Sequence, residues 1–225
     1  GTIDKYMGDC IMAFWNAPMD VPAHARRACE AALAMHAKLA ALNETWQAEA
    51  KAQGRSLPLI EIGTGLNTGP CVVGNMGSTL RVDYTVLGDD VNLASRLEGQ
   101  SKTYGVRVII GPRTRELAPD FAALELDLLR VKGKQLPVRI YALLDSPEAA
   151  KGEAFLALQK EHDAMLAAYR RQDWQAVHGA LPRLADLGAP WRLAKLYHLY
   201  DERVAAYLAH PPGADWDGVH VAESK

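Results

Sequence analysis

The sequence predicts an α+β fold, with helices on one face of a sheet, followed by a helical appendage. Up to about Asp145, short β-branched segments alternate with helical stretches and many glycines, a pattern typical of strands mixed with packing helices. Beyond Ser146 and Pro147 the chain is rich in alanine and leucine and shows almost no strand pattern. Its 225 residues are 49% hydrophobic and 23% charged, which is the composition of a globular protein. We expect one domain at 1–145 and a helical tail at 146–225.

A β-hairpin is predicted at the start of the chain. Thr2–Tyr6 and Cys10–Trp15 flank Met7-Gly8-Asp9, which has a glycine at a turn position. Pro22 then introduces a long helix that ends near Gly54. Apolar residues recur along this helix at steps of four and three, which predicts one buried stripe made of Ala28, Ala32, Met35, Leu39, Leu42 and Trp46.

Short apolar segments predict the other strands of the first domain. They are Leu59–Leu66, Cys71–Asn75, Arg81–Leu87, Val106–Ile110, Leu124–Val131 and Val138–Leu144. A helix is expected from Asp89 to Tyr104. In the tail, helices are expected at about Glu148–Arg171, Trp174–Leu187 and Trp191–Ala209.

The tail contains one helix pair of tetratricopeptide-like appearance. Its start at Asp173-Trp174 resembles the way such pairs begin, but a repeat array usually needs at least about three units. Because a short helical pair more often buries itself than recruits a partner, we favour a structural appendage over a face that docks a partner.

Composition and missing motifs argue against several classes of function. The 25 Lys and Arg residues nearly balance 27 Asp and Glu, for a formal net charge of −2, so attraction to nucleic acid is not expected. No apolar segment approaches the roughly 18 residues of a membrane helix. The three widely spaced cysteines indicate a reducing, cytoplasmic compartment. There is no P-loop or paired-histidine metal motif, and Gly63, Gly65 and Gly69 miss the dinucleotide-binding spacing.

Three segments are unusually polar for their surroundings, namely Lys5–Asp9, Tyr84–Glu98 and Arg130–Lys134. In the second segment, Asn92 and Arg96 stand four residues apart and would share one face of a helix. An amide and a guanidinium that project together can hold a polar, anionic ligand. Alone this pair is weak evidence, because Asn and Arg on a helix are usually only solvated.

These segments form part of an ordered series of motifs. The series is Asp4-Lys5-Tyr6-Met7-Gly8-Asp9, then residues 74–78, 83–89, 92–98 and 131–134. In this order, over residues 1 to about 144, it resembles the catalytic domain of the class III nucleotidyl cyclases, in particular IIIb-like adenylate cyclases of the bacterial CHASE2-linked type. The resemblance implies a ferredoxin-like fold that converts ATP into 3′,5′-cyclic AMP and pyrophosphate for intracellular signal transduction.

The resemblance also implies two divalent cations, Mg²⁺ or Mn²⁺, in each active site. Asp9 matches a metal-binding aspartate. Lys5 matches the lysine that hydrogen-bonds a ring nitrogen of adenine, and Thr85 stands where many adenylate cyclases carry an aspartate for the adenine amino group. A threonine there resembles the IIIb subclass, some of whose members respond to bicarbonate. Its hydroxyl both donates and accepts, so it discriminates between purine bases less strictly than a carboxylate would.

The remaining matches concern the ribose and the phosphates. Asn92 matches the residue that orients the ribose. Arg96 matches the residue that neutralises the charge building on the α-phosphate in the transition state. Lys132 matches the lysine that holds the terminal phosphates, and Lys134 is close enough in sequence to compete for that role.

The resemblance further implies a homodimer. Lys5 and Asp9 share one hairpin, but in the family they serve different active sites. Each subunit lends its metal side to one site and its base side to the other, so a two-fold dimer would have two sites.

The chain departs from the family at its start. The family's first strand carries a second metal-binding aspartate, which has no counterpart here because the sequence begins at the hairpin. We expect a longer native protein, whose upstream segment could hold a transmembrane sensor, and little or no activity from these residues alone.

Two alternatives stay open. A guanylate cyclase is the nearest, although such enzymes usually replace the lysine by an acidic residue, so the retained Lys5 favours ATP. The other is a non-catalytic module that binds nucleotide or dimerises. The intact Asp9, Asn92 and Arg96 favour an enzyme.

Overall fold

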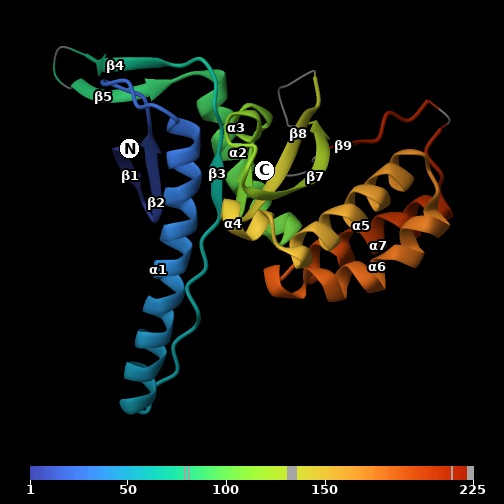
Figure 1. Ribbon diagram of the computed structural model, residues 1–225. Coiled ribbons are helices and arrows are strands. Elements are labelled where there is room, and N and C mark those ends of the chain that lie inside the picture. The colour runs from blue at the N-terminus through green and yellow to red at the C-terminus, as the bar shows by residue number, and fades with distance from the viewer. Residues whose placement is uncertain (79, 81, 131–135, 214, 222–225) are drawn as a thin grey trace.

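The computed structural model describes residues 1–225 except 79, 81, 131–135, 214 and 222–225 (Figure 1). Its strands are β1 (Thr2–Met7), β2 (Cys10–Phe14), β3 (Thr64–Leu66), β4 (Val72–Gly77), β5 (Val82–Leu87), β6 (Val108–Ile110), β7 (Ala122–Arg130), β8 (Val138–Asp145) and β9 (Val219–Val221). Its helices are α1 (His24–Ala52), α2 (Asp89–Tyr104), α3 (Pro112–Leu117), α4 (Pro147–Ala150), α5 (Glu153–Arg170), α6 (Trp174–Gly188) and α7 (Ala194–Ala209), with a 3-10 turn at Ala189–Trp191. None of these helices combines the length and hydropathy needed to cross a membrane.

Among the described residues, the central sheet has five strands in the order β3-β6-β8-β7-β9. Strand β8 runs antiparallel to β6 and β7, whereas β3 pairs parallel with β6 and β9 pairs parallel with β7. Strands β1 with β2, and β4 with β5, form two separate antiparallel hairpins. The hairpin predicted around Met7-Gly8-Asp9 is confirmed, and Gly8 has the positive φ of 65° that favours glycine in a turn.

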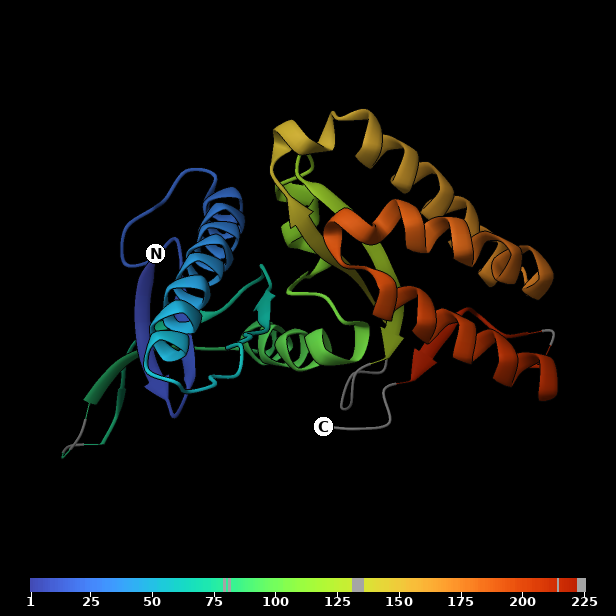
Figure 2. The ribbon, with the colours of Figure 1, turned by 90° about the horizontal axis from the view of Figure 1, so that it is seen from below.

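Helices cover both faces of the central sheet, not one face as expected. Successive residues of a strand point to opposite faces, and in β6 Ile109 belongs to one buried cluster while Val108 and Ile110 belong to another. The first cluster packs α2 and the tail helices on the sheet. The second packs α1 and the residues that follow α3 on it. Figure 2 shows α1 on one side of the sheet and the tail on the other.

Helix α1 extends beyond the sheet (Figure 1). Ala28 and Ala32 of the predicted stripe are buried, but Met35 is 40% exposed. Leu39, Leu42 and Trp46, in the second half of the helix, are only half-buried, so the prediction of one continuous buried stripe is wrong there. That half projects past the sheet, where the described residues offer it only the segment that follows α1.

The segment after α1 runs back along the helix, and the strand predicted over Leu59–Leu66 is reduced to β3. The Asn43 side chain donates to the Ile60 carbonyl (2.8 Å) and accepts from the Ile60 N–H (3.0 Å), while Gln47 donates to the Leu57 carbonyl. Because helix side chains satisfy these backbone groups, the segment does not need a strand partner.

The tail shares a core with the first domain. Leu124 and Ile140 of the sheet belong to the same buried cluster as Leu158 of α5 and Leu196 of α7. After α7 the chain returns to the sheet as β9. Neither β9 nor the short α3 was expected, and the helix predicted at Glu148–Arg171 divides into α4 and α5.

Candidate active site

Asp4 brings Lys5 and Thr85 together, although Asp4 and Thr85 lie 81 positions apart in the chain. Strand β1 contacts β5 here, and Phe14 packs beside Tyr84 with 6.2 Å between ring centroids. The Thr85 hydroxyl donates to Oδ2 of Asp4 across 2.6 Å, and Nζ of Lys5 lies 3.5 Å from Oδ1. The Asp4 side chain is 1% exposed, whereas that of Lys5 is 39% exposed. One buried carboxylate therefore contacts both predicted base-reading residues.

Asn92 and Arg96 lie on α2, which follows β5 after the single residue Gly88. Asn92 is exposed and Arg96 is half-buried, while the neighbouring Leu93 and Leu97 are 4% and 0% exposed. The predicted helix from Asp89 to Tyr104 is present with these bounds. Its leucines hold it on the core, so the amide and the guanidinium share a helix face outside that apolar stripe.

Contacts from the β3 side fix the position of α2. A Cβ at Gly65 would overlap the backbone of Ala94 and Glu98, so this glycine lets the strand and the helix meet backbone to backbone. Just beyond β3, the Asn67 amide donates to the carbonyl (3.1 Å) and the carboxylate (2.9 Å) of Asp90. The first turns of α2, which present the candidate residues, are therefore held from one side by β3 and its loop.

The tail holds the other end of α2. The Tyr104 hydroxyl donates to Asp127 (2.6 Å), which also accepts from Arg203 of α7 (2.7 Å). Lys195 of α7 donates to the carbonyl of Lys102 (2.6 Å). Burial raises the pKa of Tyr104, and the Asp127 charge raises it further. Burial disfavours the charge of Arg203, but Asp127 together with Tyr104, Tyr200 and Tyr169 outweighs this effect and raises the pKa of the guanidinium.

Asp9 lies in the exposed turn between β1 and β2. In the part of the chain that the structure describes, no three His, Cys, Asp or Glu side chains gather into a group that could hold a metal ion. A single exposed carboxylate still fits Mg²⁺, which proteins commonly bind through one or two carboxylates together with substrate phosphates. Asp9 therefore fits the role of one ligand among several.

Asp4 is the residue that the sequence analysis left without a role. Aspartate is depleted in strands, so an Asp inside a predicted strand could have drawn attention to it. Its pairing with Thr85 depends on a contact between two hairpins, which no local pattern reveals. Two predicted phosphate-binding residues, Lys132 and Lys134, lie outside the described residues.

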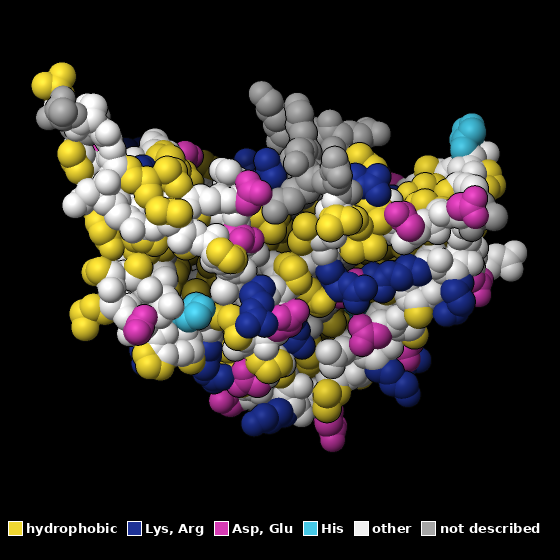
Figure 3. Space-filling model, turned by 90° about the horizontal axis from the view of Figure 1, so that it is seen from above, with side chains coloured by type: hydrophobic (Ala, Val, Ile, Leu, Met, Phe, Trp, Pro, Cys, Tyr) yellow, Lys and Arg dark blue, Asp and Glu magenta, His cyan; other side chains and the backbone are white. Residues whose placement is uncertain are grey.

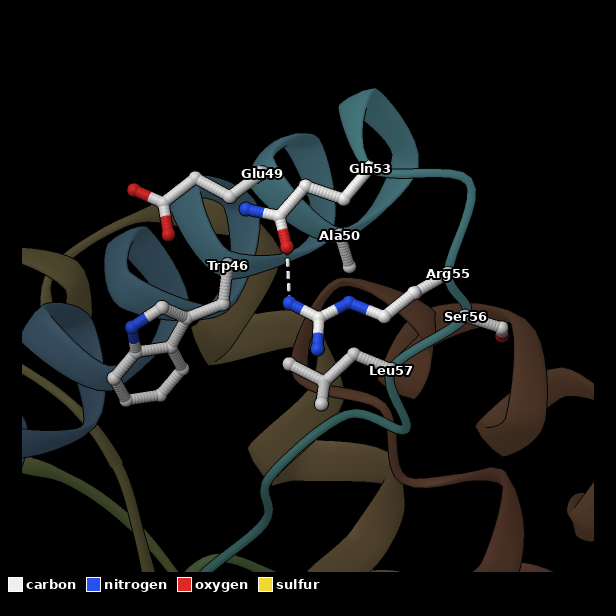
Figure 4. Close-up of a pocket in the computed structure, with 7 residues that line it drawn as sticks. All are labelled: Trp46, Glu49, Ala50, Gln53, Arg55, Ser56 and Leu57. Carbon is white, nitrogen blue, oxygen red and sulfur yellow. Dashed lines mark hydrogen bonds between the residues drawn. The ribbon is translucent and has the colours of Figure 1, made fainter.

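Two surface pockets lie elsewhere on the molecule. The first, at the end of α1 (Figure 4), is lined by Trp46, Glu49, Ala50, Gln53, Arg55, Ser56 and Leu57. The second, on α6 and α7, is lined by His178, Leu181, Pro182, Ala185, Ala194, Tyr197, His198 and Asp201. Neither pocket includes a predicted site residue. Of the described candidate residues, Asp9 and Asn92 are exposed, Lys5 and Arg96 are half-buried, and Thr85 is 7% exposed.

The two hairpins expose many apolar side chains. Eight of them are 39% to 68% exposed, namely Ile3, Tyr6, Met7, Ile11, Val72, Val82, Tyr84 and Leu87. Figure 3 shows hydrophobic side chains gathered on the hairpin side of the molecule. Exposure of so many apolar side chains on two neighbouring hairpins is typical of an interaction site.

The first domain is similar in sequence to known nucleotide cyclases. A family model of the adenylate and guanylate cyclase catalytic domain matches residues 4–145. Adenylate cyclase 1 of Rhizobium meliloti is 37% identical over 145 residues, which are 64% of this chain and 21% of that protein. An adenylate cyclase of Anabaena cylindrica is 38% identical over 145 residues, which are 63% of this chain and 28% of that protein. The chain thus spans less than a third of either relative.

Solved structures show the same similarity. The adenylyl cyclase CyaB from P. aeruginosa has 39% identity and a TM-score of 0.57, over 65% of this chain and 72% of that chain. The guanylyl cyclase Cya2 has 34% identity and a TM-score of 0.55, over 68% of this chain and 72% of that chain. The family match ends at residue 145, which is the last residue of β8.

Proposed function

The chain belongs to the family of adenylate and guanylate cyclase catalytic domains, and from this we propose that it is an adenylate cyclase that converts ATP into 3′,5′-cyclic AMP and pyrophosphate. In this reaction the ribose 3′-oxygen bonds to the α-phosphorus, the bond from that phosphorus to the bridging oxygen of pyrophosphate breaks, and the hydroxyl proton is lost. The observation that carries the choice of ATP is the cluster of Lys5, Asp4 and Thr85.

Lys5 and Thr85 would read the base. A lysine ammonium can only donate hydrogen bonds, so it suits N1 of adenine, which accepts, and opposes N1–H of guanine, which donates. Thr85 would contact the group at position 6 of the purine. The two residues come from β1 and β5, which Asp4 links within one subunit.

Asn92 and Arg96 would act on the sugar and the phosphates. The Asn92 amide, exposed near the start of α2, would orient the ribose so that its 3′-oxygen faces the α-phosphorus. Arg96 lies one helical turn further along, and its guanidinium would stabilise the negative charge that builds on the α-phosphate oxygens. A fixed cation aimed at developing charge is commonly worth several kcal/mol in the transition state.

Asp9 would supply one ligand to Mg²⁺ or Mn²⁺. When bound, such a cation lowers the pKa of the ribose 3′-hydroxyl and neutralises phosphate oxygens. Asp9 is exposed in a tight turn, which leaves its carboxylate accessible to a cation that arrives with the nucleotide. Two cations per site, as the resemblance implies, remain a prediction.

A homodimer would complete the site. The apolar side chains exposed on the two hairpins support an interface there, because burying them favours association. Asp9 lies in the turn of the hairpin, whereas Lys5 lies within β1 beside Asp4. In a two-fold dimer, one subunit would present its turn to the base-reading and α2 residues of the other.

The direct test is to incubate the purified chain, and a longer form of the protein, with Mn²⁺ and either ATP or GTP and to quantify both cyclic nucleotides. Little or no product is expected from these residues alone, so the choice of nucleotide is measured on the longer form. We expect cyclic AMP to dominate, and chelation of the metal to abolish it. Arg96→Ala should lower kcat by at least about a hundredfold while the circular-dichroism spectrum is unchanged. Arg113→Ala, at an exposed α3 arginine that pairs with Glu116, is the matched control and should keep full activity.

Each remaining outcome has a defined meaning. Dominant cyclic GMP would favour the guanylate cyclase alternative, which the similarity to Cya2 keeps open. Absence of both products, from this chain and from any longer form of the protein, would favour a non-catalytic module. Equal activity of the Arg96→Ala and wild-type proteins would contradict the role of Arg96.

A further inference from the structure

We propose that Asp4 is a positioning residue that fixes the direction of the Thr85 hydroxyl and so makes Thr85 select adenine. This inference rests on the proposed cyclase function and concerns the choice between ATP and GTP. Its basis is the hydrogen bond from Thr85 to the carboxylate of Asp4 (2.6 Å), together with the near-complete burial of that carboxylate.

The hydrogen bond removes an ambiguity in Thr85. A threonine hydroxyl has one proton and two lone pairs, so a free threonine can donate to one base or accept from another. An ionised carboxylate only accepts, and the Thr85 proton is therefore committed to Asp4. What Thr85 can still offer a nucleotide is its lone pairs. The residue behaves as an acceptor, like the aspartate that it replaces in the family pattern.

The purine bases differ at the group that Thr85 would meet. Adenine carries an amino group at position 6, which donates, whereas guanine carries a carbonyl, which accepts. A fixed acceptor would pair with the adenine amino group and would face the guanine carbonyl with no proton between them. A site built to pair with a donor discriminates strongly against a ligand that lacks it.

Asp4 also influences the position of the Lys5 ammonium group. The ammonium lies 3.5 Å from Oδ1, while Thr85 uses Oδ2 of the same carboxylate. The negative charge holds the lysine near the threonine, so that a donor and an acceptor stand side by side. That pattern complements N1 and the amino group of adenine, and guanine presents the reverse pattern at both atoms.

Asp4→Asn is the decisive variant. An asparagine amide can donate to Thr85 and free its proton for a guanine carbonyl, so the preference for ATP over GTP in kcat/KM should fall about tenfold, the usual effect of one hydrogen bond. Asp20→Asn, at an exposed carboxylate away from the cluster, should leave the preference unchanged. Thr85→Val should also lower the preference, and Asp4→Asn added to Thr85→Val should change it by less than Asp4→Asn changes the wild-type preference. Thr85→Ser should keep it.

A measurement on the wild-type protein covers the case in which Asp4→Asn fails to fold. Purine riboside 5′-triphosphate lacks the amino group, and we expect it to compete against ATP about tenfold more weakly than unlabelled ATP does. Equal competition would overturn the inference, because Thr85 would then not accept from the amino group. An Asp4→Asn protein that folds and keeps the wild-type ATP preference would overturn it as well. Both results leave the proposed function intact, whereas absence of turnover of either nucleotide, by this chain and by any longer form of the protein, overturns both proposals.

Discussion

Arg203 and Asp127 form an ion pair inside the protein, with 2.7 Å between Nη1 and Oδ2. Their side chains are 7% and 3% exposed. Asp127 belongs to the sheet and Arg203 to the last tail helix, and the Tyr104 hydroxyl at the end of α2 donates to the same carboxylate oxygen. The tail is thus bonded to the helix that presents Asn92 and Arg96.

Removal of one partner of this ion pair should destabilise the whole chain. Arg203→Met would leave the Asp127 carboxylate buried with only neutral partners, the Tyr104 hydroxyl and the Leu128 N–H, which should cost about 3–5 kcal/mol in the free energy of unfolding. Urea titration followed by circular dichroism measures this loss. Arg183→Met, at an exposed arginine paired with Glu161, is the matched control and should cost less than about 1 kcal/mol. A loss that small for Arg203→Met would show that the pair does not anchor the tail.

Gly65→Ala should displace α2. The new methyl group would overlap the backbone of Ala94 and Glu98, and backbone cannot move aside as a flexible side chain can. We expect a loss of about 1–3 kcal/mol in unfolding free energy and a fall in cyclase activity larger than the stability loss explains. Gly99→Ala on the same helix, where a Cβ meets nothing within 4 Å, should instead stabilise by about 0.5–1 kcal/mol. Similar effects of the two substitutions would contradict the close approach of β3 and α2.

His162 should make stability depend on pH. Burial lowers its pKa to about 4, and the nearby charge of Arg170 acts in the same direction, while the hydrogen bond to the Glu125 carbonyl partly opposes them. The unfolded chain, with a histidine pKa near about 6.5, binds more protons than the folded chain between these values. Stability is therefore complete above about pH 6.5 and falls by on the order of 3 kcal/mol as the pH drops to about 4.

Urea unfolding between pH 4 and 7 tests this prediction, because the depressed pKa of His162 lies at the lower end of that range. The free energy of unfolding is compared as a function of pH for the wild type, His162→Gln and His178→Gln. Glutamine at position 162 can still donate to the Glu125 carbonyl but does not titrate, so its slope with pH should be shallower. His178 is 71% exposed, so the slope of its variant should match that of wild type. Equal slopes for all three proteins would show that His162 is not held neutral.

Local patterns predicted most elements of the first domain. The hairpin followed from a glycine turn between two strand-like segments, and a helix was expected over Asp89–Tyr104, where α2 lies. These features depend on neighbours in sequence, so a local reading suffices. The strand expected from Leu59 failed because Asn43 and Gln47, on a distant part of α1, bond to its backbone.

Features that depend on long-range contacts could not be predicted from the sequence. Strand β9 has only three residues, Val219–Val221, and exists because β7 offers it an edge. Asp4 was visible as a residue, but its meaning depends on Thr85 in another hairpin. Likewise, Gly65 was considered only as part of a nucleotide-binding spacing, whereas its role is to let a helix approach a strand.

Lys5→Glu should change the preference between nucleotides. A carboxylate at this position can accept from N1–H of guanine but repels N1 of adenine, so ATP turnover should fall at least about tenfold more than GTP turnover. Kinetics with both nucleotides give the two values of kcat/KM. Lys38→Glu, at an exposed position of α1, introduces the same charge change away from the cluster and should leave the ratio unchanged.

The glutamate of Lys5→Glu would also stand beside the buried Asp4 carboxylate, so a part of the loss in turnover will reflect repulsion between like charges. Lys5→Gln, which adds no negative charge, separates the two effects. An unchanged ATP to GTP ratio in Lys5→Glu would refute the assignment of Lys5 to the base.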